Sequence, residues 1–128
     1  MRIKQLLIGM TASVIAVSSY VEMAIADLKF PMLVYRTGAY APNGIPNADG
    51  FVDYYKMNNA RDGGIGGEKI VFPECETGYK TQVGVECYEK NKKDAMVFQP
   101  MSTGITYQLI PKATSDGVTI YSTGYGRT

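Results

Sequence analysis

Four threonines of this sequence are each followed directly by glycine, and they supply the side chains best suited to binding chemistry. The pairs are Thr37-Gly38, Thr77-Gly78, Thr103-Gly104 and Thr123-Gly124, the third lying within Met101-Ser102-Thr103-Gly104. Ser and Thr hydroxyls both donate and accept hydrogen bonds, and N–H groups at the start of a helix attract anions. The same residues also cap helices and form tight turns. The pattern therefore favours binding of a small polar ligand, with capping as the open alternative.

The composition excludes several kinds of catalysis. The sequence has no histidine, so neither a Ser-His-Asp triad nor a His-ligated metal site can form. Glu74 and Glu76 flank Cys75 and could form an acid–base pair, but carboxylates at a loop edge are usually solvated. We expect no catalytic residue, no metal site and no cofactor.

The two cysteines, Cys75 and Cys87, are twelve positions apart. In an exported chain, an even count of cysteines favours a disulfide, and closing so short a loop would stabilise the fold by about 3 kcal/mol. A redox pair or a metal site is less consistent with this spacing, because it is not C-x-x-C and no other soft ligand is present. We predict a structural disulfide.

The first 26 residues have the features of a secretory signal peptide. A basic start precedes the apolar run Leu6–Val21, and Ala24-Ile25-Ala26 offers the small residues of a cleavage site. We predict cleavage between Ala26 and Asp27, which places the mature chain in the periplasm. It carries 11 basic and 11 acidic residues once Arg2, Lys4 and Glu22 are removed. A net charge of zero argues against nucleic acid or an anionic membrane as partner.

Short apolar runs alternate with segments of helical spacing along the mature chain. The runs typical of buried strands are Met32–Arg36, Lys69–Pro73, Ala95–Gln99 and Val118–Thr123. The expected helices are Asn47–Arg61 with Pro46 in its first turn, Thr81–Asn91, and Ile105–Ala113 interrupted near Pro111. This order predicts an α/β fold with a doubly wound, mostly parallel sheet. Ligands of such sheets bind beyond the carboxyl ends of the strands, where the four Thr-Gly loops would lie.

The stretches "YRTGAYAPNGIPNADGFVDYYKMNNARDGGIGGEKI", "ECETGYKTQVGVECYEKNKK", "MSTGITYQLIPKA" and "YSTGYGRT" resemble periplasmic substrate-binding proteins of ABC importers. The likeness is to the type I, two-lobe receptors for branched-chain amino acids, urea or amides. It implies that residues 27–128 form part of the first lobe, and that the sequence is an N-terminal fragment. It also implies an inner-membrane permease as partner.

The resemblance further implies where a ligand binds. An amino acid or amide would contact Ser102 and Thr103 after the third strand, and Gly124 and Tyr125 after the fourth. Tyr40, after the first strand, would line the end that holds the ligand side chain. The Ser102-Thr103-Gly104 turn would then both cap its helix and present donors to a carboxylate, although Thr103 pointing inward would only cap.

Two other functions remain open. The hydroxyl-rich turn is also similar to the phosphate loop of flavodoxin-like proteins, which would make the chain an exported flavin- or nucleotide-binding domain. A sensor domain built on the same receptor fold is the second alternative.

Overall fold

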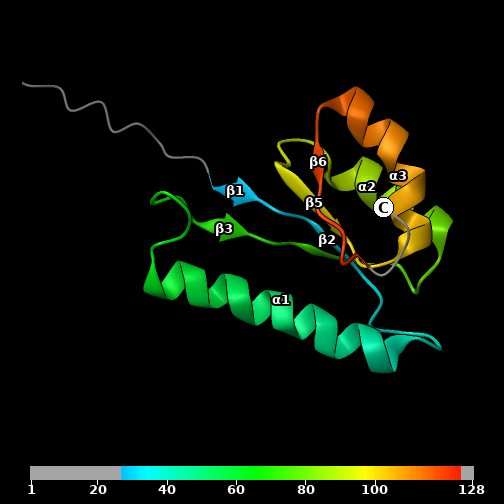
Figure 1. Cartoon of the computed structure of the whole chain (residues 1–128), viewed down its shortest axis with the longest axis horizontal. Coiled ribbons are helices and arrows are strands. Elements are labelled where there is room, and N and C mark those ends of the chain that lie inside the picture. Colours follow the sequence, from blue (N-terminus) through cyan, green and yellow to red (C-terminus); the bar gives the residue numbers. More distant parts are fainter. Residues whose placement is uncertain (1–26, 125–128) are drawn as a thin grey trace, which may run out of the picture.

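The computed structural model describes residues 27–124 (Figure 1). The elements in chain order are β1 (Leu28–Lys29), β2 (Met32–Val34), α1 (Ala41–Arg61), β3 (Ile70–Val71), β4 (Glu74–Glu76), α2 (Thr81–Asn91), β5 (Val97–Pro100), α3 (Thr103–Asp116) and β6 (Thr119–Ile120). Strands and helices alternate, and every pairing between strands is parallel. The predicted α/β fold class is therefore confirmed.

Two prolines divide what is in effect one sheet. The strand order is β4-β2-β5-β6, with β1 paired to β3 as a continuation. Pro31 separates β1 from β2, and Pro73 separates β3 from β4, because proline has no N–H to donate to the ladder. Hydrogen bonds from Phe30 N to Val71 O (2.8 Å) and from Met32 N to Pro73 O (2.9 Å) carry the pairing across the break.

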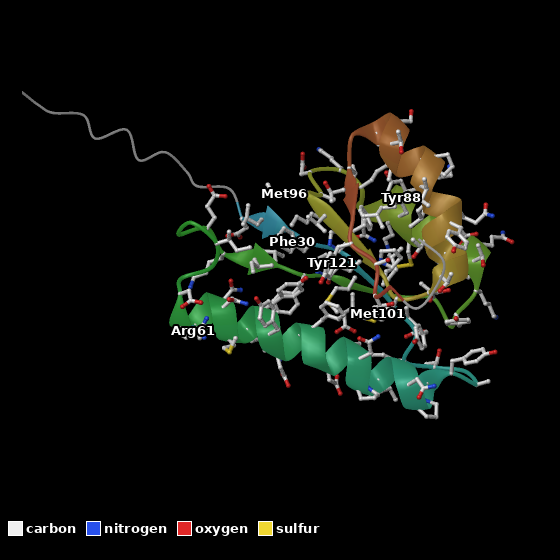
Figure 2. All side chains as sticks on the ribbon, in the orientation of Figure 1. Phe30, Arg61, Tyr88, Met96, Met101 and Tyr121 are labelled. Carbon is white, nitrogen blue, oxygen red and sulfur yellow. A yellow bond between two sulfur atoms is a disulfide. The ribbon has the colours of Figure 1, made fainter. Side chains whose placement is uncertain are left out.

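Helices cover both faces of the sheet, and the core divides accordingly. Alternate residues of β2 point to opposite faces: Met32 and Val34 belong to the cluster under α1, while Leu33 belongs to the cluster under α2 and α3. Figure 2 shows Phe30 on the α1 side and Tyr88 among α2 and α3. No helix within residues 27–124 is long and apolar enough to cross a membrane.

Two of the three expected helices have different limits from those predicted. Helix α1 begins at Ala41, so Pro42 occupies its first turn and Pro46 lies inside it. The missing N–H of Pro46 leaves only the exposed carbonyl of Pro42, near the helix start, without its helical partner.

Helix α3 runs without interruption through Pro111, so the predicted break there is wrong. Pro111 is exposed, while Leu109 and Ala113 on either side of it are buried against the sheet. Their packing holds the helix together across the missing hydrogen bond. Helix α3 ends at Asp116. The next residue, Gly117, caps it, because its φ of 69° lets its N–H donate to the carbonyls of Ala113 and Thr114.

Candidate ligand-binding site

The four Thr-Gly loops leave the same edge of the sheet, because all the strands that precede them are parallel. We call this the carboxyl edge, formed by residues 35–40, 77–80, 101–102 and 121–124. Main-chain hydrogen bonds tie it together, from Thr77 N to Val34 O (2.8 Å), Met101 N to Leu33 O (3.2 Å) and Tyr121 N to Phe98 O (2.8 Å). Four separate stretches of sequence therefore meet at one rim.

Ser102 sits at the centre of this rim, at the N-cap of α3. Its side chain is 2% exposed, and its Oγ accepts a long hydrogen bond of 3.5 Å from Ile105 N. The first turn of α3 contains no acidic residue, so no negative charge within it offsets the positive end of the helix dipole. The helix start is therefore suited to an anionic group.

Thr103 is the first residue of α3, and its side chain is half-buried. The cap is made by Ser102, so the alternative in which Thr103 caps the helix is not what the structure shows. Gly104 comes close to the start of α2, because a Cβ on Gly104 would lie 3.3 Å from Thr81 Oγ1. The starts of α2 and α3 thus face the same part of the rim.

Two of the other Thr hydroxyls serve the fold itself. Thr77 is 2% exposed, and its Oγ1 donates to Val34 O (2.7 Å) and accepts from Tyr79 N (3.2 Å). Thr37 Oγ1 donates to Glu76 Oε1 (3.2 Å). The hydroxyls of Thr37 and Thr77 therefore stabilise the turns that contain them.

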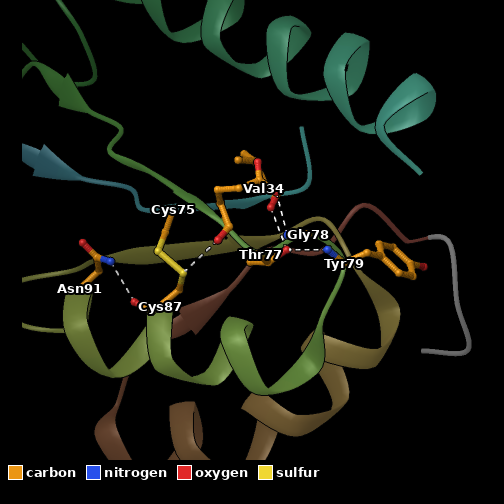
Figure 3. The surroundings of a disulfide bond; sticks show 8 residues. Val34, Cys75, Thr77, Gly78, Tyr79, Cys87 and Asn91 are labelled. Carbon is orange, nitrogen blue, oxygen red and sulfur yellow. Dashed lines mark hydrogen bonds between the residues drawn. A yellow bond between two sulfur atoms is a disulfide. The ribbon is translucent and has the colours of Figure 1, made fainter. Parts of the chain in front are cut away.

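Tyr40 lies at the rim, where its ring contacts that of Tyr79, a residue that the sequence analysis did not single out. Tyr40 is 54% exposed, and its ring centroid lies 4.5 Å from that of Tyr79. Tyr79 packs edge-on against buried Tyr35 at 4.8 Å; Figure 3 shows Tyr79 on the turn that follows Thr77. The only sequence signal for Tyr79 was its place within a glycine turn at a strand end.

Glu74 and Glu76 lie on strand β4, where both are exposed, and each carboxylate is also paired. Arg36 donates to both oxygens of Glu74 (2.6 and 2.8 Å) and to Asp49 (2.7 Å). The hydrogen bonds to Glu74 and then Asp49 raise the pKa of Arg36. Glu76 accepts from the N–H groups of Arg36 and Gly78, each at 2.7 Å. Both carboxylates therefore hold loops in place.

The predicted disulfide between Cys75 and Cys87 is present, with 5.9 Å between the two Cα atoms (Figure 3). It ties β4 to α2. Both elements lead into or out of the turn that carries Tyr79, so the disulfide restrains that turn from two sides. Within the described range, no three Cys, Asp or Glu side chains are grouped to hold a metal ion.

The remaining predicted residues are only partly described. Gly124 is exposed, has a φ of 72°, and donates from its N–H to Ser122 Oγ (3.3 Å). Asp27 is the first described residue. Tyr125, Ala26 and the rest of the predicted signal peptide lie outside the described residues.

A cleft of about 680 Å³ lies between α1 and the sheet. Aromatic and apolar side chains dominate its walls, among them Phe30, Phe51, Tyr55 and Tyr121. Burial raises the pKa of Tyr55 to about 12. Val97 and Gln99 of β5 and Thr119 of β6 line the cleft on the sheet side. The cleft lies against the sheet face and meets the carboxyl edge at Tyr121.

Residues 27–128 match the model of the periplasmic binding protein family. The chain belongs to this family. A comparison with curated protein sequences gave no match. Membership confirms the expectation of a binding protein rather than an enzyme, and it favours the receptor interpretation over a flavodoxin-like domain.

Solved structures show the same fold. One is described as an ABC transporter permease from the Pseudomonas fluorescens group, with 39% identity and a TM-score of 0.73, over 80% of this chain and 26% of that one. The branched-chain amino acid transporter substrate-binding protein of Streptococcus pneumoniae, in complex with isoleucine, has 21% identity and a TM-score of 0.67. The match covers 76% of this chain and 28% of that one. A solute-binding protein from R. palustris, in complex with benzoate, has 22% identity and a TM-score of 0.61. The match covers 76% of this chain and 27% of that one. This periplasmic binding protein chain thus spans about a quarter of each structure.

Proposed function

We propose that this chain contributes the ligand-binding edge of a solute receptor for an ABC importer. Its ligand would be a small carboxylate or amide, of the class that includes branched-chain amino acids, urea and short amides. The observation that carries the proposal is the start of α3 at the carboxyl edge, capped by Ser102 over a long hydrogen bond, in a chain of this family.

The proposed contacts are those that the resemblance to the family implies. A ligand carboxylate would accept hydrogen bonds from the first N–H groups of α3 and from the hydroxyls of Ser102 and Thr103. Gly124 and Tyr125 would close the opposite side, after β6. Isoleucine and benzoate, bound by two structures of this fold, both present a carboxylate, which supports an anion as the group held at this point.

The partners and the location belong to the same proposal. A receptor of this class delivers its solute to a permease and ATPase in the inner membrane, so we place the mature chain in the periplasm. Mass spectrometry of the exported protein tests the predicted processing, since cleavage after Ala26 gives a chain that begins at Asp27.

Isothermal titration calorimetry with isoleucine, benzoate, urea and propionamide tests ligand binding. The exported protein is expected to bind at least one carboxylate. Removing the hydroxyl of Ser102 or Thr103, as Ser102→Ala and Thr103→Val, should weaken that binding about 10- to 100-fold, because hydrogen bonds to a charged group are worth about 1.5–3 kcal/mol.

The matched control is Ser115→Ala, which removes an exposed hydroxyl from the far end of the same helix. It should leave affinity unchanged. Thermal melting of each variant separates loss of the Ser102 cap, about 0.5–2 kcal/mol, from loss of ligand contacts. An exported protein that binds none of the four compounds would contradict the proposed function.

A further inference from the structure

The cleft between α1 and the sheet has the size and the walls of a small-molecule site. Its volume of about 680 Å³ falls within the range of roughly 300–1,000 Å³ that is typical of ligand pockets. The ring centroid of Phe51 in α1 lies 6.4 Å from that of Tyr121, and the centroid of Tyr55 lies 5.8 Å from that of Phe30. Figure 2 shows Phe30 and Tyr121 on the side of the sheet that faces α1. Aromatic rings therefore line the cleft from the helix and from the sheet.

The walls of the cleft are polar at a few points and carry no charge. Among residues 27–124, no charged side chain lines it. Its polar groups are the tyrosine hydroxyls and the side chains of Asn47, Asn58, Gln99 and Thr119. Moving an ion from water into such surroundings is costly unless an opposite charge pairs with it. The cleft therefore suits an uncharged molecule, unlike the start of α3, where the proposed function places an anion.

Gln99 supplies an unused hydrogen-bond acceptor in the wall on the sheet side. The residue is 3% exposed, and its Oε1 has no hydrogen-bond partner among the described residues. A hydrogen bond joins its side chain to that of Tyr55, so the amide N–H is the donor in that bond and the oxygen stays unpaired. A buried acceptor without a partner destabilises the fold. An O–H or N–H group placed against this oxygen would supply the missing bond.

Gly50 keeps the helix side of the cleft open. It lies inside α1, where alanine would be more stable than glycine. A Cβ at this position would meet nothing within 4 Å, so no contact in the described fold requires glycine here. Because Gly50 lines the cleft, the missing side chain leaves space that a bound molecule can fill.

From these observations we propose that the cleft is a separate binding site for an uncharged, largely apolar ring compound that carries a hydrogen-bond donor, such as a phenol. The ring packs against Phe51, Tyr55 and Tyr121, where edge-on and offset contacts between aromatic rings are favourable. Its donor bonds to Gln99 Oε1. This site does not depend on the proposed function, because it uses neither the start of α3 nor a charged group.

The experiment compares phenol with toluene, which has a methyl group of similar size in place of the hydroxyl. Calorimetric dissociation constants are measured for the exported chain and for Gln99→Met and Gly50→Leu. We expect the unaltered chain to bind both probes. Gln99→Met removes the acceptor at nearly constant length, so it should weaken phenol about two- to tenfold relative to toluene. Gly50→Leu fills part of the cleft and should weaken both probes about tenfold.

Two matched controls should leave both dissociation constants unchanged. Gln82→Met alters an exposed glutamine of α2, which covers the other face of the sheet, and Ala60→Leu enlarges an exposed residue of α1 that does not line the cleft. Circular dichroism of each variant checks that it folds. Gln99→Leu gives the same comparison of phenol with toluene if the methionine variant does not fold.

Three results of the titrations would overturn the inference. They are failure of the unaltered chain to bind either probe, equal weakening of phenol and toluene by the change at Gln99, and no effect of Gly50→Leu. Sedimentation velocity tests for another occupant, since a dimer of this chain that excludes phenol would also overturn it. Neither probe carries a carboxylate, so each of these results leaves the proposed function standing.

Discussion

Gly44 in α1 allows a test of how closely this helix must approach the sheet to position the rim. A Cβ built on Gly44 would lie 1.9 Å from the carbonyl oxygen of Tyr35 and 2.3 Å from its ring. Real Cβ contacts are essentially never under 3.0 Å, so in Gly44→Ala the helix start must move away by at least about 1.1 Å. The obstacle includes main chain, which no side-chain rotation can relieve.

Gly50 in the same helix is the matched control, because a Cβ there would meet nothing within 4 Å. Alanine is favoured over glycine inside a helix by about 1 kcal/mol, so Gly50→Ala should raise the free energy of unfolding by about that amount. Gly44→Ala has the same gain in helix propensity, but overpacking typically costs about 1–3 kcal/mol of stability. Because the Cβ would meet main chain at 1.9 Å, we expect a cost at or above about 3 kcal/mol. The free energy of unfolding should then fall by about 2 kcal/mol.

Denaturant unfolding followed by far-ultraviolet circular dichroism measures both free energies. The two substitutions are chemically identical and lie in one helix, so the difference of about 3 kcal/mol isolates the close approach to Tyr35. A Gly44→Ala variant as stable as Gly50→Ala would refute the reasoning. It would mean that the start of α1 does not pack against Tyr35 as described.

Three further predictions concern the stability of the fold. Replacing Cys75 and Cys87 together by alanine should lower the free energy of unfolding by about 3 kcal/mol, and reductant should then have no further effect in the denaturant titration. The hydrogen bond from Tyr88 is the main cause that lowers the pKa of Asp116, so the stability that this charge contributes is lost as the pH falls from about 5 towards 2. In Asp116→Asn the fall in Tm over that pH range should be smaller. A dependence of Tm on pH equal to that of the unaltered chain would contradict a stabilising role for the Asp116 charge. Burial raises the pKa of Tyr55 and of Tyr88 to about 12, so stability should fall as the pH rises from about 10 to 12; phenolate absorbance should show these two rings ionising only as the chain unfolds.

Much of the fold could be predicted from local patterns. The alternation of apolar strands with helical segments gave the α/β class, since periods of 2 and 3.6 are properties of neighbouring residues. The boundaries were less accurate at proline. The sequence reasoning placed Pro46 in a first turn and a break at Pro111, whereas packing of residues such as Leu109 and Ala113 carries α3 through.

The candidate site could be predicted only in outline. Ser102 at the start of a helix was evident from its residue type and its position after a strand, and the structure places it there as the N-cap. The ring contact between Tyr79 and Tyr40 was not evident, because the two residues are 39 positions apart. The pairing of Arg36 with Glu74, which removed the apparent acid–base pair, likewise joins residues 38 positions apart.

The sequence by itself determined the alternation of strands and helices, the likeness to its family and the even cysteine count, because each depends on residues read one after another. It did not show the strands Leu28–Lys29 and Glu74–Glu76. Only the tertiary structure decided which side chains share the carboxyl edge and which hydroxyls are occupied within the fold. Parallel strands bring distant loops to one border, and the contacts made there depend on strand order and on helix packing, which neighbouring residues do not specify.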